Sequence, residues 1–172
     1  MTTTAFATPA AFTRARLAER GYPMTHVFLA TDPGREDGEP GLGMEAAFPY
    51  EDLVELLDVC YPAHVASSQG ADAARRRVQR ARVRKLLDIA DQHFEGITMH
   101  ATLDREKGPS VTSQTVIQGD FDFMAWSIET EEGRRLVRPG LAKSMVQFID
   151  DLRQQIIKDC GEVYEELQAL KQ

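Results

Sequence analysis

The chain lacks most of the features from which a protein's function is usually recognised. Among its 172 residues there are two cysteines, Cys60 and Cys160, and neither has the close cysteine or histidine neighbours that a zinc site needs. No apolar run approaches the roughly 18 residues of a membrane-spanning helix. The glycine-rich patterns of nucleotide-binding loops, the serine elbow of hydrolases and the paired histidines of zinc proteases are missing as well. We therefore expect a cytoplasmic protein with no metal, no cofactor and no membrane partner.

What the chain does have is the composition of an ordinary folded domain. Hydrophobic residues make up 42% and charged residues 27%, which is too apolar for wholesale disorder. At this length a single domain over residues 1–172 can bury a real core, and we predict disorder for residues 1–10. The net charge of −7 means that the molecule as a whole repels nucleic acid and anionic membranes, so any such binding must be local.

Hydrophobic spacing predicts several helices and one early strand. Apolar residues recur at helical intervals after Pro49 and again over residues 71–94, and residues 11–20 form a shorter helical pattern. The apolar run at residues 26–30 predicts a strand. Residues 31–43 are rich in glycine, proline and acid, so we expect them to form a flexible acidic loop.

The middle of the chain changes to the pattern of strands. The segments ITMHATLD, VTSQTVIQ and FDFMAWSI are rich in β-branched or aromatic residues, and Gly119 with Asp120 suits a hairpin turn between the last two. We predict a small three-stranded antiparallel meander over about residues 97–128, packed against helices. With EEGRRLVRPG as a connector after it, the expected fold class is α+β.

A long helix is expected at the end of the chain, over residues 141–170. At about 1.5 Å per residue it spans about 45 Å, whereas a compact domain of this size is about 40 Å across, so one end should overhang. The apolar residues of that last stretch are Val163, Tyr164, Leu167 and Leu170. Left exposed, this stripe favours a homodimer or another partner, while a bend at Gly161 would instead fold it back onto its own domain.

A basic segment, residues 75–85, lies in the helix expected over residues 71–94. Its charges point almost all the way round a helix, so this part must face water or an acidic surface. They belong to Arg75, Arg76, Arg77, Arg80, Arg82, Arg84 and Lys85. One interpretation is contact with the phosphate backbone of a nucleic acid, and the other is compensation by the acid-rich residues 31–59 of the same chain.

One short motif points to an enzyme. In HATLDR, His100 and Thr102 would share one face of a strand, where an imidazole can move a proton and a hydroxyl can hold a phosphoryl oxygen. The motif resembles half of the paired site of the 2H phosphoesterases, which implies a second histidine, and His26 is the candidate for it. The chain departs from that pattern at Phe28, which stands where the first motif has Thr or Ser and cannot donate a hydrogen bond.

No catalytic set is complete in this sequence. We therefore predict a non-enzymatic, acidic protein–protein interaction module of the inhibitor, adaptor or chaperone type, whose partner is another protein. Its candidate binding surfaces are the basic residues 75–85 and the apolar end of the last helix. Two alternatives remain: a 2H-like phosphoesterase using His26, His100 and Thr102, and nucleic-acid binding through residues 75–85.

Overall fold

The structure of the protein is a computed structural model, and it describes most of the chain. The described residues are 9–25, 27–31, 42–62, 70–104, 108–117, 123–138 and 140–170. For residues 9, 28–31, 42–43, 101–104 and 108–117 the description covers the backbone only. Residues 1–8, for which we expected disorder, lie outside the described residues, as do residues 32–41 of the expected acidic loop.

The scaffold is one antiparallel sheet whose strands are arranged in chain order. It consists of β1 (Val27–Thr31), β2 (Leu42–Pro49), β3 (Phe94–Asp104) and β4 (Gly108–Ile117). Along β2, Met44, Ala46 and Phe48 are buried while Glu45 and Ala47 are exposed. This alternation shows that one face of the sheet meets the core and the other does not.

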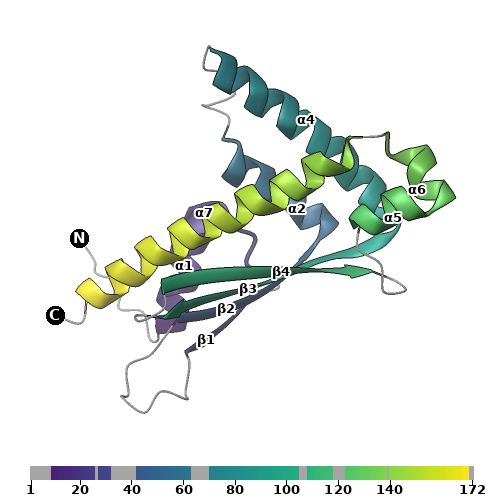
Figure 1. Cartoon of the computed structure of the whole chain (residues 1–172). Coiled ribbons are helices and arrows are strands. Elements are labelled where there is room, and N and C mark those ends of the chain that lie inside the picture. The colour runs from purple at the N-terminus through teal and green to yellow at the C-terminus, as the bar shows by residue number, and fades with distance from the viewer. Residues whose placement is uncertain are drawn as a thin grey trace.

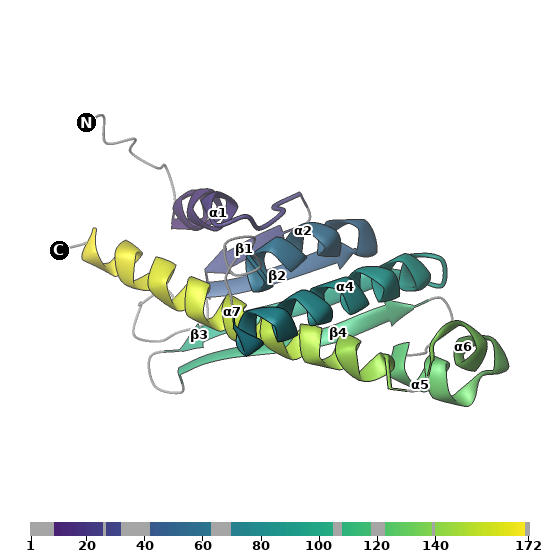
Figure 2. The ribbon, with the colours of Figure 1, turned by 90° about the horizontal axis from the view of Figure 1, so that it is seen from above.

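Helices cover a single face of that sheet (Figures 1 and 2). They are α1 (Pro9–Glu19), α2 (Tyr50–Cys60), α4 (Ala71–Asp91), α5 (Phe123–Glu129), α6 (Glu131–Leu136) and α7 (Ala142–Ala169). α7 runs diagonally across the helical layer and packs against α1, α2, α4, α5, β3 and β4, so it joins both ends of the fold. None of the helices in the described part of the chain has both the length and the apolar character of a bilayer-spanning segment.

The mixed α+β class is confirmed, and so are the long helices. The helix expected after Pro49 is α2, the one expected over residues 71–94 is α4, and the one expected over residues 141–170 is α7. Each of them buries an apolar stripe in the core. The strand expected at residues 26–30 corresponds to β1.

The structure corrects the predicted three-stranded meander over residues 97–128. Two of its strands exist, within β3 and β4, but the third predicted strand contains the helix α5. Phe123 and Trp126 lie about one helical turn apart, and both are buried in a cluster with the ring of Phe94. Burial of these rings outweighs the preference of aromatic residues for strands.

Two further elements occupy segments that we expected to be irregular. Residues 42 and 43, at the end of the expected acidic loop, begin β2, and the expected connector contains the short helix α6. α6 begins where the Thr130 hydroxyl accepts a hydrogen bond from the Gly133 N–H at 2.9 Å, which satisfies one of the free donors of its first turn. At the N-terminus, Pro9 and Ala10 belong to α1 and are not part of a disordered tail.

The end of α7 is covered by α1, so the expected overhang is wrong for most of the stripe. Val163 is 0% and Leu167 is 8% exposed, Tyr164 is half-buried, and Leu170 is 64% exposed. The two helices lie side by side in Figure 2, and α7 is continuous through Gly161. Packing by α1 therefore removes the uncovered stripe from which we expected a homodimer, and the homodimer itself stays a prediction.

Polar contacts around the buried Asp159 carboxylate fasten the N-terminal segment to α7. Arg20 Nη1 lies 3.0 Å from Asp159 Oδ1 and 2.5 Å from Glu162 Oε2, and the Tyr22 hydroxyl donates a 2.6 Å hydrogen bond to Asp159 Oδ2. Asp159 is only 6% exposed, so its charge depends on these partners. Burial, and then the hydrogen bond to Asp159, raise the pKa of Tyr22 far above its ordinary value. We call these four residues the Asp159 clasp.

Gly96 permits a close approach between β2 and β3. A Cβ at this position would lie 2.2 Å from the Phe48 carbonyl oxygen. We expect Gly96→Ala to lower the free energy of unfolding by about 1–3 kcal/mol, because backbone must move. Gly161→Ala is the matched control: a Cβ there meets no atom within 4 Å, and alanine should stabilise the helix by about 0.5–1 kcal/mol. Urea unfolding measures both changes, and equal effects at the two glycines would contradict this account.

Replacing Tyr22 by phenylalanine tests the Asp159 clasp. Tyr22→Phe keeps the ring but removes a hydrogen bond to a buried carboxylate, so the free energy of unfolding should fall by about 1.5–3 kcal/mol at neutral pH. Because the pKa of Tyr22 is raised on folding, its contribution is present below the ordinary value of 10.0 and is lost as the pH rises above it. Urea titrations should show a difference between wild type and variant that is constant up to about pH 10 and then shrinks. A difference independent of pH would argue against the clasp.

Candidate functional site

The helix α4 is central to the candidate site because only part of its surface is covered. Val83, Leu87 and Ala90 are buried in the core, and the helix also packs against α2 and α7. A further stripe of side chains, offset around the helix axis, lines an open groove between α4 and the connection from α6 to α7. This groove is called the α4–α6 groove below.

The α4–α6 groove has a volume of about 770 Å³ and two walls of different kinds. The first wall is the α4 stripe, formed by Val78, Ala81, Arg82, Lys85, Leu86 and Ile89. The second wall is formed by Leu136, Arg138, Gly140 and Leu141. Because the α4 residues follow one another at intervals of three or four, they share one helix face, and the wall extends for about 16 Å along the axis.

A second hollow of about 330 Å³ continues from the groove, since Arg138 and Gly140 line both. Its apolar lining includes Met124, Ile128 and Val137. Among the described residues, the large hydrophobic side chains left exposed are Val78, Ile128, Leu136, Val146 and Leu170. Three of these five line the groove or the second hollow, so the exposed apolar surface of the described chain is concentrated here.

The charges around the two hollows are all of one sign. Five cationic residues line them, namely Arg82, Lys85, Arg134, Arg138 and Lys143, and none of the lining residues is acidic. Within the described part of the chain, no ion pair is found for any of these five. In a molecule of net charge −7, this is a local positive and apolar surface.

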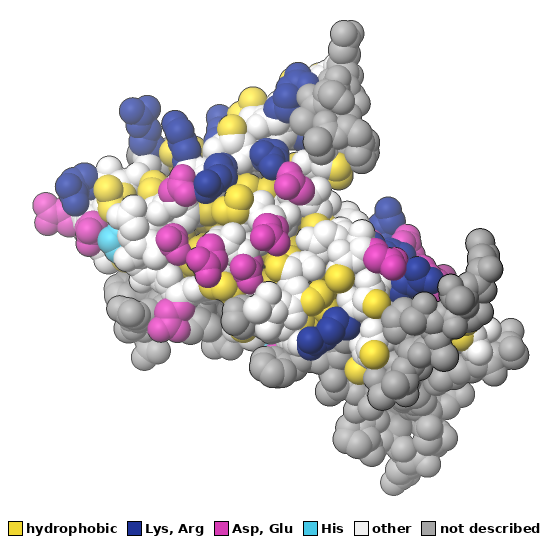
Figure 3. All heavy atoms as spheres, turned by 180° about the vertical axis from the view of Figure 1, so that it is seen from behind, with side chains coloured by type: hydrophobic (Ala, Val, Ile, Leu, Met, Phe, Trp, Pro, Cys, Tyr) yellow, Lys and Arg dark blue, Asp and Glu magenta, His cyan; other side chains and the backbone are white. Residues whose placement is uncertain are grey.

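Elsewhere on α4 the basic residues have acidic neighbours. Arg80 Nη2 lies 2.5 Å from Asp58 Oδ1 of α2, and Arg84 Nη1 lies 2.5 Å from Asp88 Oδ1 of α4 itself. Seen from behind, basic side chains gather along the edge formed by α4, and acidic side chains gather below them (Figure 3). The expected compensation between residues 31–59 and the basic segment is therefore present for Arg80. It does not extend to the groove.

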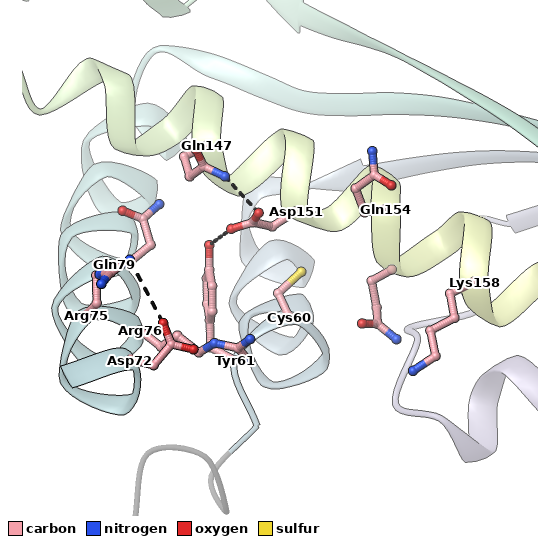
Figure 4. Close-up of a pocket in the computed structure, with 11 residues that line it drawn as sticks. Cys60, Tyr61, Asp72, Arg75, Arg76, Gln79, Gln147, Asp151, Gln154 and Lys158 are labelled. Atoms are coloured by element: carbon pink, nitrogen blue, oxygen red, sulfur yellow. Dashed lines mark hydrogen bonds and ion pairs between the residues drawn. The ribbon is translucent and has the colours of Figure 1, made fainter. Parts of the chain in front are cut away.

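A separate polar hollow of about 580 Å³ lies between α2, the first turns of α4 and α7 (Figure 4). Here the polar groups bind one another: the Tyr61 hydroxyl donates a 2.6 Å hydrogen bond to Asp151 Oδ2, and Gln147 Nε2 donates one of 2.8 Å to Asp151 Oδ1. Burial, followed by the negative charges of Asp151 and Asp159, raises the pKa of the Cys60 thiol. An uncharged thiol and an engaged carboxylate make this hollow a poor catalytic site.

The structure divides the basic residues named from the sequence between these two hollows. Arg82 and Lys85 line the α4–α6 groove, whereas Arg75 and Arg76 line the polar hollow. All of the segment's basic residues are exposed except Arg80, which is half-buried by its contact with α2. Val83, within the same segment, is 0% exposed, so the expectation that no face of residues 75–85 enters the core is wrong at this position.

The structure describes only part of the histidine motif. His100 is exposed on the uncovered face of β3, where its backbone pairs with Glu45 of β2 and Thr112 of β4. Thr102 lies two residues further along β3, and only its backbone is described. His26 is outside the described residues. The described residues also contain no group of three His, Cys, Asp or Glu placed to hold a metal ion.

The apolar part of the groove was missed from the sequence. On the groove side of α4, Val78 is 50% exposed and Ile89 is half-buried. Leu86 between them is 0% exposed and belongs to the core with Val83 and Leu87. Leu136 and Leu141, which oppose Val78 and Ile89, lie in a segment of low hydrophobic periodicity. Their meeting with α4 is decided by the packing of α7, which no local pattern reveals.

Comparison of the chain with models of known protein families, with curated proteins and with solved structures found no match.

Replacing two valines of α4 by alanine distinguishes the side of the helix that stabilises the fold from the side that does not. Val83 is 0% and Val78 is 50% exposed. We expect Val83→Ala to lower the free energy of unfolding by about 2 kcal/mol, through lost burial and a cavity. Val78→Ala should change it by less than about 0.5 kcal/mol. Chemical denaturation measures both, and a loss at Val78 as large as that at Val83 would show that the groove wall is part of the core.

Proposed function

We propose that this chain is a non-enzymatic protein-binding module and that the α4–α6 groove is its binding surface. The observation that supports this most directly is the coincidence along one face of α4 of exposed apolar side chains with cations for which the described residues provide no ion pair. Apolar side chains such as Val78 and Leu136 cost solubility when they remain in water, and a partner's side chains would cover them. The surrounding arginines and lysines form a polar rim of the kind found at protein interfaces.

The shape of the groove also favours a polypeptide over a nucleic acid. Its lining contains aliphatic side chains and no aromatic ring on which a base could stack. Nucleic-acid binding by the basic segment would use all of its exposed cations about equally, including Arg75 and Arg76 outside the groove. Protein binding would use the two that line the groove, Arg82 and Lys85.

Photo-crosslinking in cells that produce the protein tests the proposal. A photo-reactive amino acid is placed at Val78 or at Leu136 in the groove, and at Glu55, an exposed position of α2, as the control. We expect one partner polypeptide, identified by mass spectrometry, to crosslink from both groove positions and not from Glu55. The purified partner should then bind the chain directly.

Two results would refute protein binding at this surface. One is the absence of any adduct from Val78 and Leu136, and the other is a set of adducts that is the same from Glu55 as from the groove. Adducts composed of RNA or DNA would favour the nucleic-acid alternative instead.

A further inference from the structure

We infer that the segment received by the α4–α6 groove is an acidic amphipathic helix of about three turns from the partner protein. This inference rests on the proposed function, and it adds the secondary structure and the charge of the bound segment. Three properties of the groove lead to it: the geometry of its long wall, the order of apolar and charged groups along that wall, and the continuation into the second hollow.

The geometry of the long wall selects a helix. Residues 78–89 of α4 form a wall about 16 Å long, which matches about three turns of a helix lying alongside. Its accessible apolar surface comes from exposed Val78 and Ala81 and half-buried Ile89. A strand added by the partner would need the free backbone N–H and C=O groups of a sheet edge. This wall offers none, because residues 78–89 lie inside α4, where the backbone groups bond one another. A polyproline segment would need aromatic side chains in the groove, and none of its lining residues is aromatic.

The cations on the two walls of the groove indicate the charge of the segment that would bind there. Exposed Val78 and Ala81 and half-buried Ile89 form the accessible apolar line, since Leu86 is 0% exposed. Arg82 and Lys85 stand beside this line on the same helix. Arg138 stands on the opposite wall, so cations flank the apolar line from both sides. A helix with an apolar stripe bordered by Asp and Glu satisfies both features at once, whereas a basic helix would meet like charges along its whole length.

The second hollow offers a site for one more apolar side chain beyond the end of the groove. Arg138 and Gly140 belong to both hollows, so the two hollows adjoin, and a Cβ at Gly140 would meet no atom within 4 Å. Met124 and Ile128 line the far side, with Arg134 and Lys143 at the rim. The cationic rim therefore continues, and the acidic character expected of the partner extends over the whole bound segment.

Binding of designed peptides measures this inference directly. The probe is a fluorescently labelled peptide of about 18 residues with leucines at helical spacing bordered by glutamates. The comparison peptides replace every glutamate by lysine, or keep the composition and scramble the order. Fluorescence anisotropy should show the acidic amphipathic peptide binding at least about tenfold more tightly than either, with an affinity that falls as salt is added.

Two pairs of charge reversals on the same helix separate groove binding from general attraction. Arg82→Glu with Lys85→Glu should weaken binding of the acidic peptide by about tenfold or more. Arg75→Glu with Arg76→Glu changes the net charge equally but lies outside the groove, and it should leave the affinity within about twofold. Circular dichroism checks that both double variants remain folded, and Val78→Ser tests the apolar contact without changing charge.

Several outcomes would overturn the inference. They are failure of the acidic peptide to bind at about 1 mM, equal binding of the acidic and basic peptides, equal weakening by the two pairs of reversals, and tighter binding of a single-stranded oligonucleotide. Crosslinks from Val78 and Leu136 to a partner segment that is neither acidic nor helical would overturn it while leaving the proposed function standing. The two proposals can therefore fail separately.

Discussion

The burial of one long stripe of α7 is the constraint on which the rest of the structure depends. Phe148, Leu152, Ile156 and Val163 are each 0% exposed, and they lie along a helix that contacts elements from both ends of the chain. A four-stranded sheet covered on one face has room for only a few helices, and the diagonal path of α7 fills the space that α2 and α4 leave. The N-terminal helix completes the layer, because the Asp159 clasp and its apolar residues hold it against the last turns of α7.

The same arrangement leaves α4 with a side that nothing in the described chain covers. α7 begins beside α5, packs against α4 and ends beside α1, so the connection before α7 stands opposite α4 across the groove. Arg80 is drawn to Asp58 on the side of α2, whereas Arg82 and Lys85 remain on the open side. An acidic molecule thus keeps a small cationic and apolar surface whose composition is opposite to its average.

Sequence patterns predicted the helices that bury a long apolar stripe and the strands that pair with a neighbour in the chain. α2, α4 and α7 follow from helical spacing, and the paired strands β3 and β4 follow from β-branched residues around a short connection. α5 did not, because Phe123 and Trp126 obtain their helical arrangement from contacts with Phe94, which lies in another element. The groove was beyond prediction for a related reason: Val78 and Leu136 are distant in the chain, and they line one groove only because the packing of α7 sets the connection before it opposite α4.

The topology of the sheet has a consequence for how the chain folds. β1 with β2, and β3 with β4, are neighbours in both chain and sheet, so each pair can form as a local hairpin. β2 and β3 are neighbours in the sheet, yet α2 and α4 lie between them in the chain. The pairing of β2 with β3 closes a long loop that contains two helices. We therefore expect this pairing to be the slow step of folding. Until then, the facing edges of β2 and β3 stay unpaired, which leaves them open to mispairing with other chains.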